Sequence, residues 1–101
     1  MKIQQLIDDV SKRPTRYFSE PTLSRFDAFL LGWMLKSDDP STEFTLQGFQ
    51  EWIANRYGIH HSHSWMRIIR LHATDDTSAL NETFKLFEEY FELRGDDSQS
   101  E

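Results

Sequence analysis

The sequence predicts an all-α fold: a compact bundle of about five helices, with an apolar second helix at its centre. Apolar residues recur at helical spacing in five segments, and no segment alternates in the manner of a strand. The chain has 101 residues, including eight Phe, three Trp and three Tyr, which is enough bulk to enclose one core. We therefore expect a single helical domain over residues 1–95 and a disordered acidic tail over residues 96–101.

The first two expected helices precede a polar loop. The first covers about residues 3–12, where four apolar residues share one face, and Pro14 ends it because the residue before a proline avoids the α region. The second runs from about residue 21 or 22 to residue 36 and is apolar around most of its circumference, which is typical of a central helix. We interpret Gly32, in its interior, as a point where another helix crosses closely.

The remaining three expected helices follow. The third covers about residues 46–57, with Thr45 as its N-cap and Gly58 as the left-handed residue after its end. The fourth begins at Ser62 or Ser64, after a histidine-rich link, and includes residues 65–71. The fifth, about residues 78–94, has an apolar stripe on one side and carboxylates on the other, and we expect it to end at Gly95.

Negative charge is concentrated at the C-terminal end. Residues 75–101 contain nine acids and two bases, a net charge of −7, whereas the other residues sum to +1, giving −6 overall. An acidic surface on a nearly neutral body favours binding to a basic partner, although a solvated helix face has the same pattern. The residues expected to contact a partner are Asp75, Asp76, Glu82, Glu89 and Glu92, with Asp38 and Asp39 as a second acidic loop.

The composition limits the classes of function. The chain has no Cys, so disulfides and thiolate metal sites are excluded, and we expect a cytoplasmic protein. The first residues lack the apolar run of a signal peptide, and no apolar stretch is long enough to span a bilayer. The net charge argues against nucleic acids and anionic membranes as partners. No catalytic motif is present, so we expect no enzymatic activity and no cofactor.

Three other groups of residues allow a functional and a structural interpretation. His60, His61, His63 and His72 offer nitrogen ligands, but their spacing favours a polar connector over a metal site, and we assign no metal. Asp27 lies on the apolar arc of the second helix, where we expect an ion pair with Arg13 or Arg16 rather than a general base. The basic residues of the first part and of the middle of the chain could bind nucleic acid, but the anionic whole favours pairing of these arginines with carboxylates of the fifth helix.

Several motifs resemble a known group of proteins. Together they span about residues 3–93: Lys12-Arg13-Pro14-Thr15-Arg16-Tyr17, Phe29-Leu30-Leu31-Gly32-Trp33, Phe49-Gln50-Glu51-Trp52-Ile53, Ser64-Trp65-Met66-Arg67-Ile68-Ile69 and Phe84-Lys85-Leu86-Phe87-Glu88-Glu89-Tyr90-Phe91. This pattern is similar to that of small bacterial immunity proteins of contact-dependent inhibition and polymorphic toxin systems. The resemblance implies a binder that neutralises a toxin, and it identifies no contact residue.

Charge and resemblance lead to one expected function and one alternative. We expect an immunity protein that binds a cognate toxin domain, a basic nuclease, and occludes its active site inside the producing cell. Active sites that bind phosphate are positively charged, so an acidic surface is suited to plugging them. The alternative is an acidic adaptor for protein–protein interaction, unrelated to toxins. The sequence leaves the oligomeric state open.

Overall fold

The computed structural model describes residues 2–59 and 64–99, with side chains as far as residue 94, and within these residues it contains helices and no strand. The described helices are α1 (Ile3–Lys12), α2 (Pro14–Tyr17), α3 (Leu23–Lys36), α4 (Ser41–Tyr57), α5 (Trp65–Leu71) and α6 (Asp76–Gln99). The all-α prediction is confirmed, with six described helices rather than about five. In this part of the chain, no helix has the length and apolar character needed to cross a membrane.

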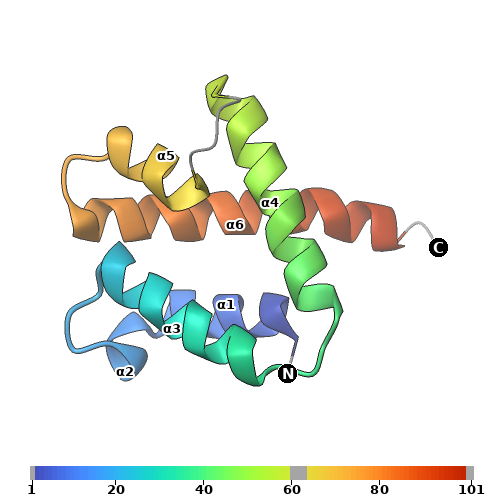
Figure 1. Ribbon diagram of the computed structural model, residues 1–101, viewed down its shortest axis with the longest axis horizontal. Coiled ribbons are helices and arrows are strands. Elements are labelled where there is room, and N and C mark those ends of the chain that lie inside the picture. The colour runs from blue at the N-terminus through green and yellow to red at the C-terminus, as the bar shows by residue number, and fades with distance from the viewer. Residues whose placement is uncertain (1, 60–63, 100–101) are drawn as a thin grey trace.

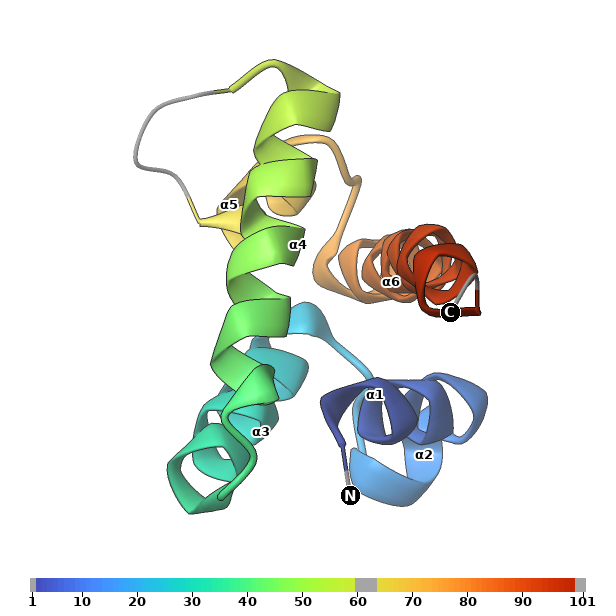
Figure 2. The same ribbon diagram turned by 90° about the vertical axis from the view of Figure 1, so that its right-hand side faces the viewer.

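The helix at the centre is α6, which contacts α1, α3, α4 and α5 (Figure 1). Figure 2 shows α6 nearly end-on, with α1 beneath it and α4 and α5 to its left. The prediction of a central second helix was therefore wrong. The corresponding helix, α3, buries Leu23, Phe26 and Leu30, but Leu31 is 61% and Leu35 81% exposed. The outer face of α3 is therefore apolar and exposed to solvent.

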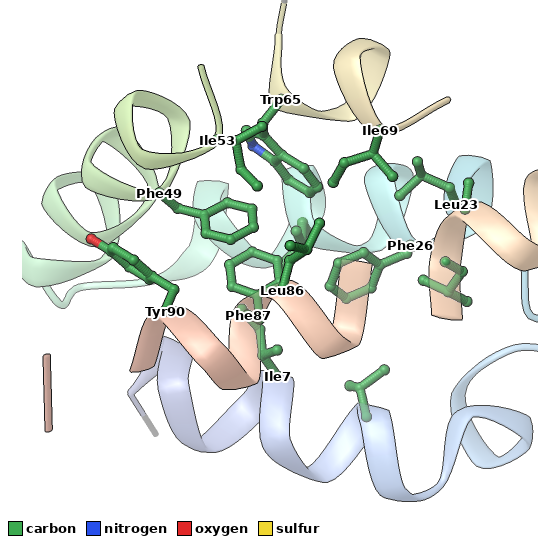
Figure 3. Packing of buried hydrophobic residues seen from close by; sticks show 14 of the residues in the cluster. Ile7, Leu23, Phe26, Phe49, Ile53, Trp65, Ile69, Leu86, Phe87 and Tyr90 are labelled. Carbon is green, nitrogen blue, oxygen red and sulfur yellow. The ribbon is translucent and has the colours of Figure 1, made fainter. Parts of the chain in front are cut away.

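The core is built around the aromatic rings that face α6 (Figure 3). The ring of Phe87, on α6, stacks on that of Phe49 of α4, with 3.8 Å between ring centroids and 11° between planes. Trp65 of α5 and Phe26 of α3 approach the same ring edge-on, at 5.5 Å and 6.4 Å. Phe26, Phe49 and Phe87 are completely buried. One side chain of α6 thus joins three other helices, and its two edge-on pairs have separations at which aromatic rings pack favourably.

Close helix packing occurs at Gly48 and not, as expected, at Gly32. A Cβ atom added at Gly48 of α4 would lie 2.3 Å from the hydroxyl of Tyr90 on α6, so a side chain there requires movement of that ring. A Cβ atom added at Gly32 would meet nothing within 4 Å. The interpretation of Gly32 as a helix crossing was therefore wrong, because the α3 face that carries it is exposed.

Several helix ends agree with the predictions. Helix α1 ends at Lys12, and Arg13, before the proline, has the extended φ of −136° expected there. Gly58 follows α4 with a φ of 68°, and the Ile59 N–H donates to the Ala54 carbonyl oxygen at 2.9 Å, as in a glycine-terminated helix. The short helix α2 was missed: proline suits the first turn of a helix, so Pro14 both ends α1 and begins α2.

Two helix ends differ from the predictions. Helix α4 begins at Ser41 instead of about residue 46, so Thr45 is not its N-cap but a buried residue inside it. The start is fixed by Asp39, whose carboxylate accepts hydrogen bonds from the Ser41 N–H at 3.0 Å and the Ser41 hydroxyl at 2.8 Å. Helix α6 does not end at Gly95 but continues to Gln99, so the expected start of the acidic tail falls within it.

The two helical glycines provide a matched test of this packing. Gly32→Ala should raise the free energy of unfolding by about 0.5–1 kcal/mol, because alanine favours the helix and meets no neighbour. Gly48→Ala should leave the protein about 1–3 kcal/mol less stable than Gly32→Ala, because the Tyr90 ring must shift. Urea unfolding of both variants in dilute solution measures the difference. Equal stability of the two variants would contradict the packing described for α4 and α6.

Candidate functional site

The exposed side of α6 carries the acidic residues that the helical pattern predicted. Glu82, Glu88, Glu89 and Glu92 are exposed, together with Lys85, whereas most apolar residues of the same turns are buried: Leu86, Phe87, Tyr90 and Phe91. A helix whose buried stripe contacts four neighbours must turn its charged residues outward, because unpaired burial of a carboxylate is costly. The exposed side of α6 is therefore an acidic face, and its carboxylates project from a helix.

The carboxylates of α6 divide between two flanks of the helix. On the flank next to α4, Glu89 pairs with Arg56 at 2.9 Å, and both side chains remain nearly half exposed. Glu82 is exposed and, within the described part of the chain, has no ion-pair partner. On the flank next to α1, Glu88 and Glu92 lie beside a groove. The sequence placed these residues on one face but could not distinguish the two flanks.

The groove between α1 and α6 has a volume of about 810 Å³. Its apolar lining comes from Ile7 of α1 and from Phe84 and Phe91 of α6. Its charged lining consists of three carboxylates, those of Asp8, Glu88 and Glu92, and one cation, the ammonium group of Lys2. Asp8 is partly neutralised by Lys12, 3.0 Å away on the same helix, but both side chains are mostly exposed, so solvent screens the pair.

Asp8 was not among the residues expected to contact a partner, and neither was Glu88. Asp8 follows the buried Ile7 in a segment that reads simply as an amphipathic helix, and nothing in the sequence shows that α1 packs beside α6. Glu88 lies at the border of the apolar stripe, where the helical pattern does not decide its role. Of the expected contact residues, only Glu92 lines this groove.

Two expected contact residues hold the start of α6 in place. Asp75 is its N-cap, and its carboxylate accepts a hydrogen bond from the Ser78 N–H at 2.7 Å, which lowers its pKa. Asp76 accepts hydrogen bonds from the backbone N–H of Ser24 at 3.0 Å and from Arg70 Nε at 3.1 Å. Partial burial would raise the pKa of Asp76, but these hydrogen bonds together lower it.

Asp38 and Asp39 lie in the loop that joins α3 to α4 and are not part of the groove lining. Asp38 is exposed. Asp39 is half-buried and holds the first turn of α4, and hydrogen bonds from the Ser41 backbone and hydroxyl, together with the nearby charge of Lys2, lower its pKa. Asp39, like Asp75 and Asp76, thus has a structural role at the start of a helix. The predicted acids that are exposed and have no such role are Glu82, Glu89, Glu92 and Asp38.

Some of the arginines form the expected ion pairs with carboxylates of α6. Arg56 pairs with Glu89, and Arg70 pairs with Asp76, so two arginines of the middle segment do neutralise carboxylates of α6. The prediction that Asp27 pairs with Arg13 or Arg16 was wrong. Arg13 pairs with Asp9 at 2.6 Å, and the same carboxylate accepts a short hydrogen bond from the Tyr17 hydroxyl, which joins α1 to α2 and lowers the pKa of Asp9.

The histidines do not form a site within the described residues. His72 is exposed, its Nδ1 lies 2.9 Å from the Ile68 carbonyl oxygen, and its ring lies 4.5 Å from that of Tyr57. His60, His61 and His63 lie outside the described residues. Within residues 2–59 and 64–99, no three side chains of the metal-ligating types gather closely enough to hold an ion.

Comparison of the chain with family models, curated proteins and solved structures finds no match. The acidic groove and the exposed side of α6 therefore have to be interpreted from their own chemistry. Acidic side chains around an apolar strip are suited to long basic side chains, whose methylene groups cover apolar surface while their charged ends reach carboxylates.

The structural role of Asp76 is tested by Asp76→Asn. The variant should lose about 1 kcal/mol of unfolding free energy near neutral pH, because it weakens the hydrogen bonds to Ser24 and Arg70 at a partly exposed site. The folded-state pKa lies below the ordinary 3.8, so this advantage of the wild type is present above pH 3.8 and disappears as the pH falls through the folded value.

Urea unfolding of both proteins at neutral and acidic pH measures this difference. Glu82→Gln is the matched control, because Glu82 is exposed and its change should stay within about 0.5 kcal/mol. If Asp76→Asn behaves like the control at neutral pH, Asp76 does not hold α6 in place.

Proposed function

We propose that this chain is an immunity protein that binds a cognate toxin domain, a basic nuclease, and occludes its active site inside the producing cell. The observation that carries the proposal is the groove between α1 and α6, where Asp8, Glu88 and Glu92 surround an apolar lining. The toxin would present lysines and arginines that otherwise bind nucleic-acid phosphate. A surface that offers carboxylates in place of phosphates can occupy them.

The division of α6 into two flanks supports the α1 side as the principal contact. Glu89 already has a cationic neighbour in Arg56, whereas Glu88 and Glu92 belong to no ion pair within the described residues. Binding that desolvates unpaired carboxylates gains new charge-assisted hydrogen bonds without breaking old ones. Phe84, the half-buried apolar residue of the lining, adds area from which water is displaced, which charges alone do not supply.

The similarity of the sequence motifs to small bacterial immunity proteins supports the same class of function. Most of those motifs supply core residues: Phe49, Trp65, Phe87 and Tyr90 all belong to the ring cluster around α6. The resemblance therefore concerns the scaffold, while the acidic groove supplies the chemistry of binding. An acidic adaptor without a toxin would use the same groove, and the nature of the captured partner distinguishes the two functions.

Affinity capture from the native cells tests the proposal. The tagged chain is used as bait at low and high salt, and the captured proteins are identified by mass spectrometry. The immunity function predicts one stoichiometric partner with a basic domain, released by salt, whose toxicity is suppressed by co-expression of this chain. Capture of a non-toxic partner would contradict it and favour the adaptor function.

The binding surface can be tested by charge reversal. Replacing Asp8, Glu88 and Glu92 by Lys should slow association with the captured toxin domain by about tenfold or more at low salt, because electrostatic steering is lost. The difference should shrink as salt is raised, since exposed charges are screened beyond about 10 Å at 0.1 M ionic strength. Stopped-flow binding at several salt concentrations measures both effects.

The matched control reverses Glu82 and Glu89, which lie on the α4 flank of the same helix, and it is compared with a groove variant that reverses Glu88 and Glu92 alone, so that each changes two charges. It tests the wider prediction that the whole acidic face contributes, and it should slow association less than the groove variant. Thermal unfolding confirms that each variant is folded. Equal association rates for the wild type and the groove variant would rule out the groove as the binding surface.

A further inference from the structure

The outer face of α3 is an uncovered apolar stripe. Ala28, Leu31, Gly32 and Leu35 are exposed and lie on one side of the helix, because they follow one another at intervals of three and four residues. Leu31 is 61% and Leu35 81% exposed. In Figure 2, α3 lies at the lower left edge of the molecule, whereas α1 and α6 lie to the right.

The apolar surface extends beyond the helix itself. Beside Ala28 it continues into a hollow of about 550 Å³ between α2 and α3, whose lining includes Tyr17 and Phe29. The absent side chain of Gly32 leaves a shallow point next to the projecting Leu31. Projections and depressions therefore alternate along the same face, as in surfaces that pack against another helix.

The two flanks of this stripe carry opposite charges. Arg25 and Lys36 lie on one flank, because residues about three turns apart return to nearly the same angle around a helix. Asp27 lies on the other flank. Within the described residues, none of the three belongs to an ion pair, although several other charged residues of the chain do.

The charge pattern is complementary to a second copy in one orientation only. When two identical helices are parallel about a two-fold axis, opposite flanks meet, so Arg25 of each copy faces Asp27 of the other. Leu31 of each copy then faces Gly32 of the other at nearly the same level. In the antiparallel orientation like flanks meet, and Arg25 faces Lys36, which is repulsive.

We propose that two copies of this chain associate through α3, with the two helices parallel about a two-fold axis. The contact is small, since a helix of 14 residues is about 21 Å long and stable interfaces bury about 1,200–2,000 Å². The dimer is therefore weak and forms in the micromolar to millimolar range. It leaves the groove between α1 and α6 open, and it does not depend on the function proposed for that groove.

Sedimentation equilibrium of the full chain, from about 10 μM to about 1 mM, tests the association. The average mass should rise with concentration from 12.0 kDa toward twice that value. Leu35→Glu should keep the mass at that of the monomer without changing the thermal unfolding curve, because Leu35 is exposed. A monomer mass for the wild type throughout, or an unchanged dimer in Leu35→Glu, overturns the proposal.

Charge exchange tests the orientation. Arg25→Glu and Asp27→Lys should each weaken self-association by about tenfold, because each creates two like-charge pairs in the parallel dimer. An equimolar mixture of these two variants should recover association close to that of the wild type, since each substituted residue then faces its opposite charge.

For one of these variants, the antiparallel orientation predicts the opposite change in the strength of self-association. Arg25→Glu would then face Lys36 and strengthen the dimer. Stronger association of Arg25→Glu, or a mixture no tighter than its components, overturns the parallel arrangement. Asp27 is half-buried, so thermal unfolding of Asp27→Lys is checked first. If Asp27→Lys does not fold, Arg25→Glu alone decides between the two orientations, because Arg25 is exposed and its replacement either weakens or strengthens the dimer.

Discussion

The stacking of Phe87 against Phe49 is the contact on which the rest of the structure depends. Because the same Phe87 ring also meets Trp65 and Phe26, α6 can bury its apolar stripe only if α3, α4 and α5 all approach that point. Helix α1 covers the remaining side through Ile7 and its neighbours. A chain of this size has room for one such centre, and it uses aromatic bulk rather than disulfides to fill it.

This arrangement determines where charge can lie. With its inner side enclosed by four helices, α6 presents carboxylates outward on a well-supported backbone, and those nearest α1 lie beside an apolar strip. Asp39, Asp75 and Asp76 instead hold helix starts, where hydrogen bonds lower their pKa values. The acidity of the chain therefore has two purposes: part of it stabilises the fold, and part of it is available to a partner. The uncovered stripe of α3 forms a separate surface with a different chemistry.

Local features of the fold were predictable from the sequence because they depend on neighbouring residues. The helical class, the end of α1 before Pro14, the left-handed Gly58 and the outward carboxylates of α6 all follow from periodicity and from the preferences of single residues. The central helix was not predictable, because α3 contains as many large apolar residues as a buried helix but directs Leu31 and Leu35 to solvent. Gly32 and Gly48 are alike in sequence, and only the position of Tyr90 distinguishes them. The groove could not be predicted, because Asp8 and Glu92 come from opposite ends of the chain and only the fold brings them to the lining of one groove.

Amide hydrogen exchange is the measurement that tests the central position of α6 most directly. If α6 organises the core, the amides of residues 79–91 exchange only through global unfolding and are the slowest in the chain, while those in the second half of α3 exchange faster through local opening. The opposite order, with α3 amides outlasting those of α6, would contradict the account and restore α3 as the central helix.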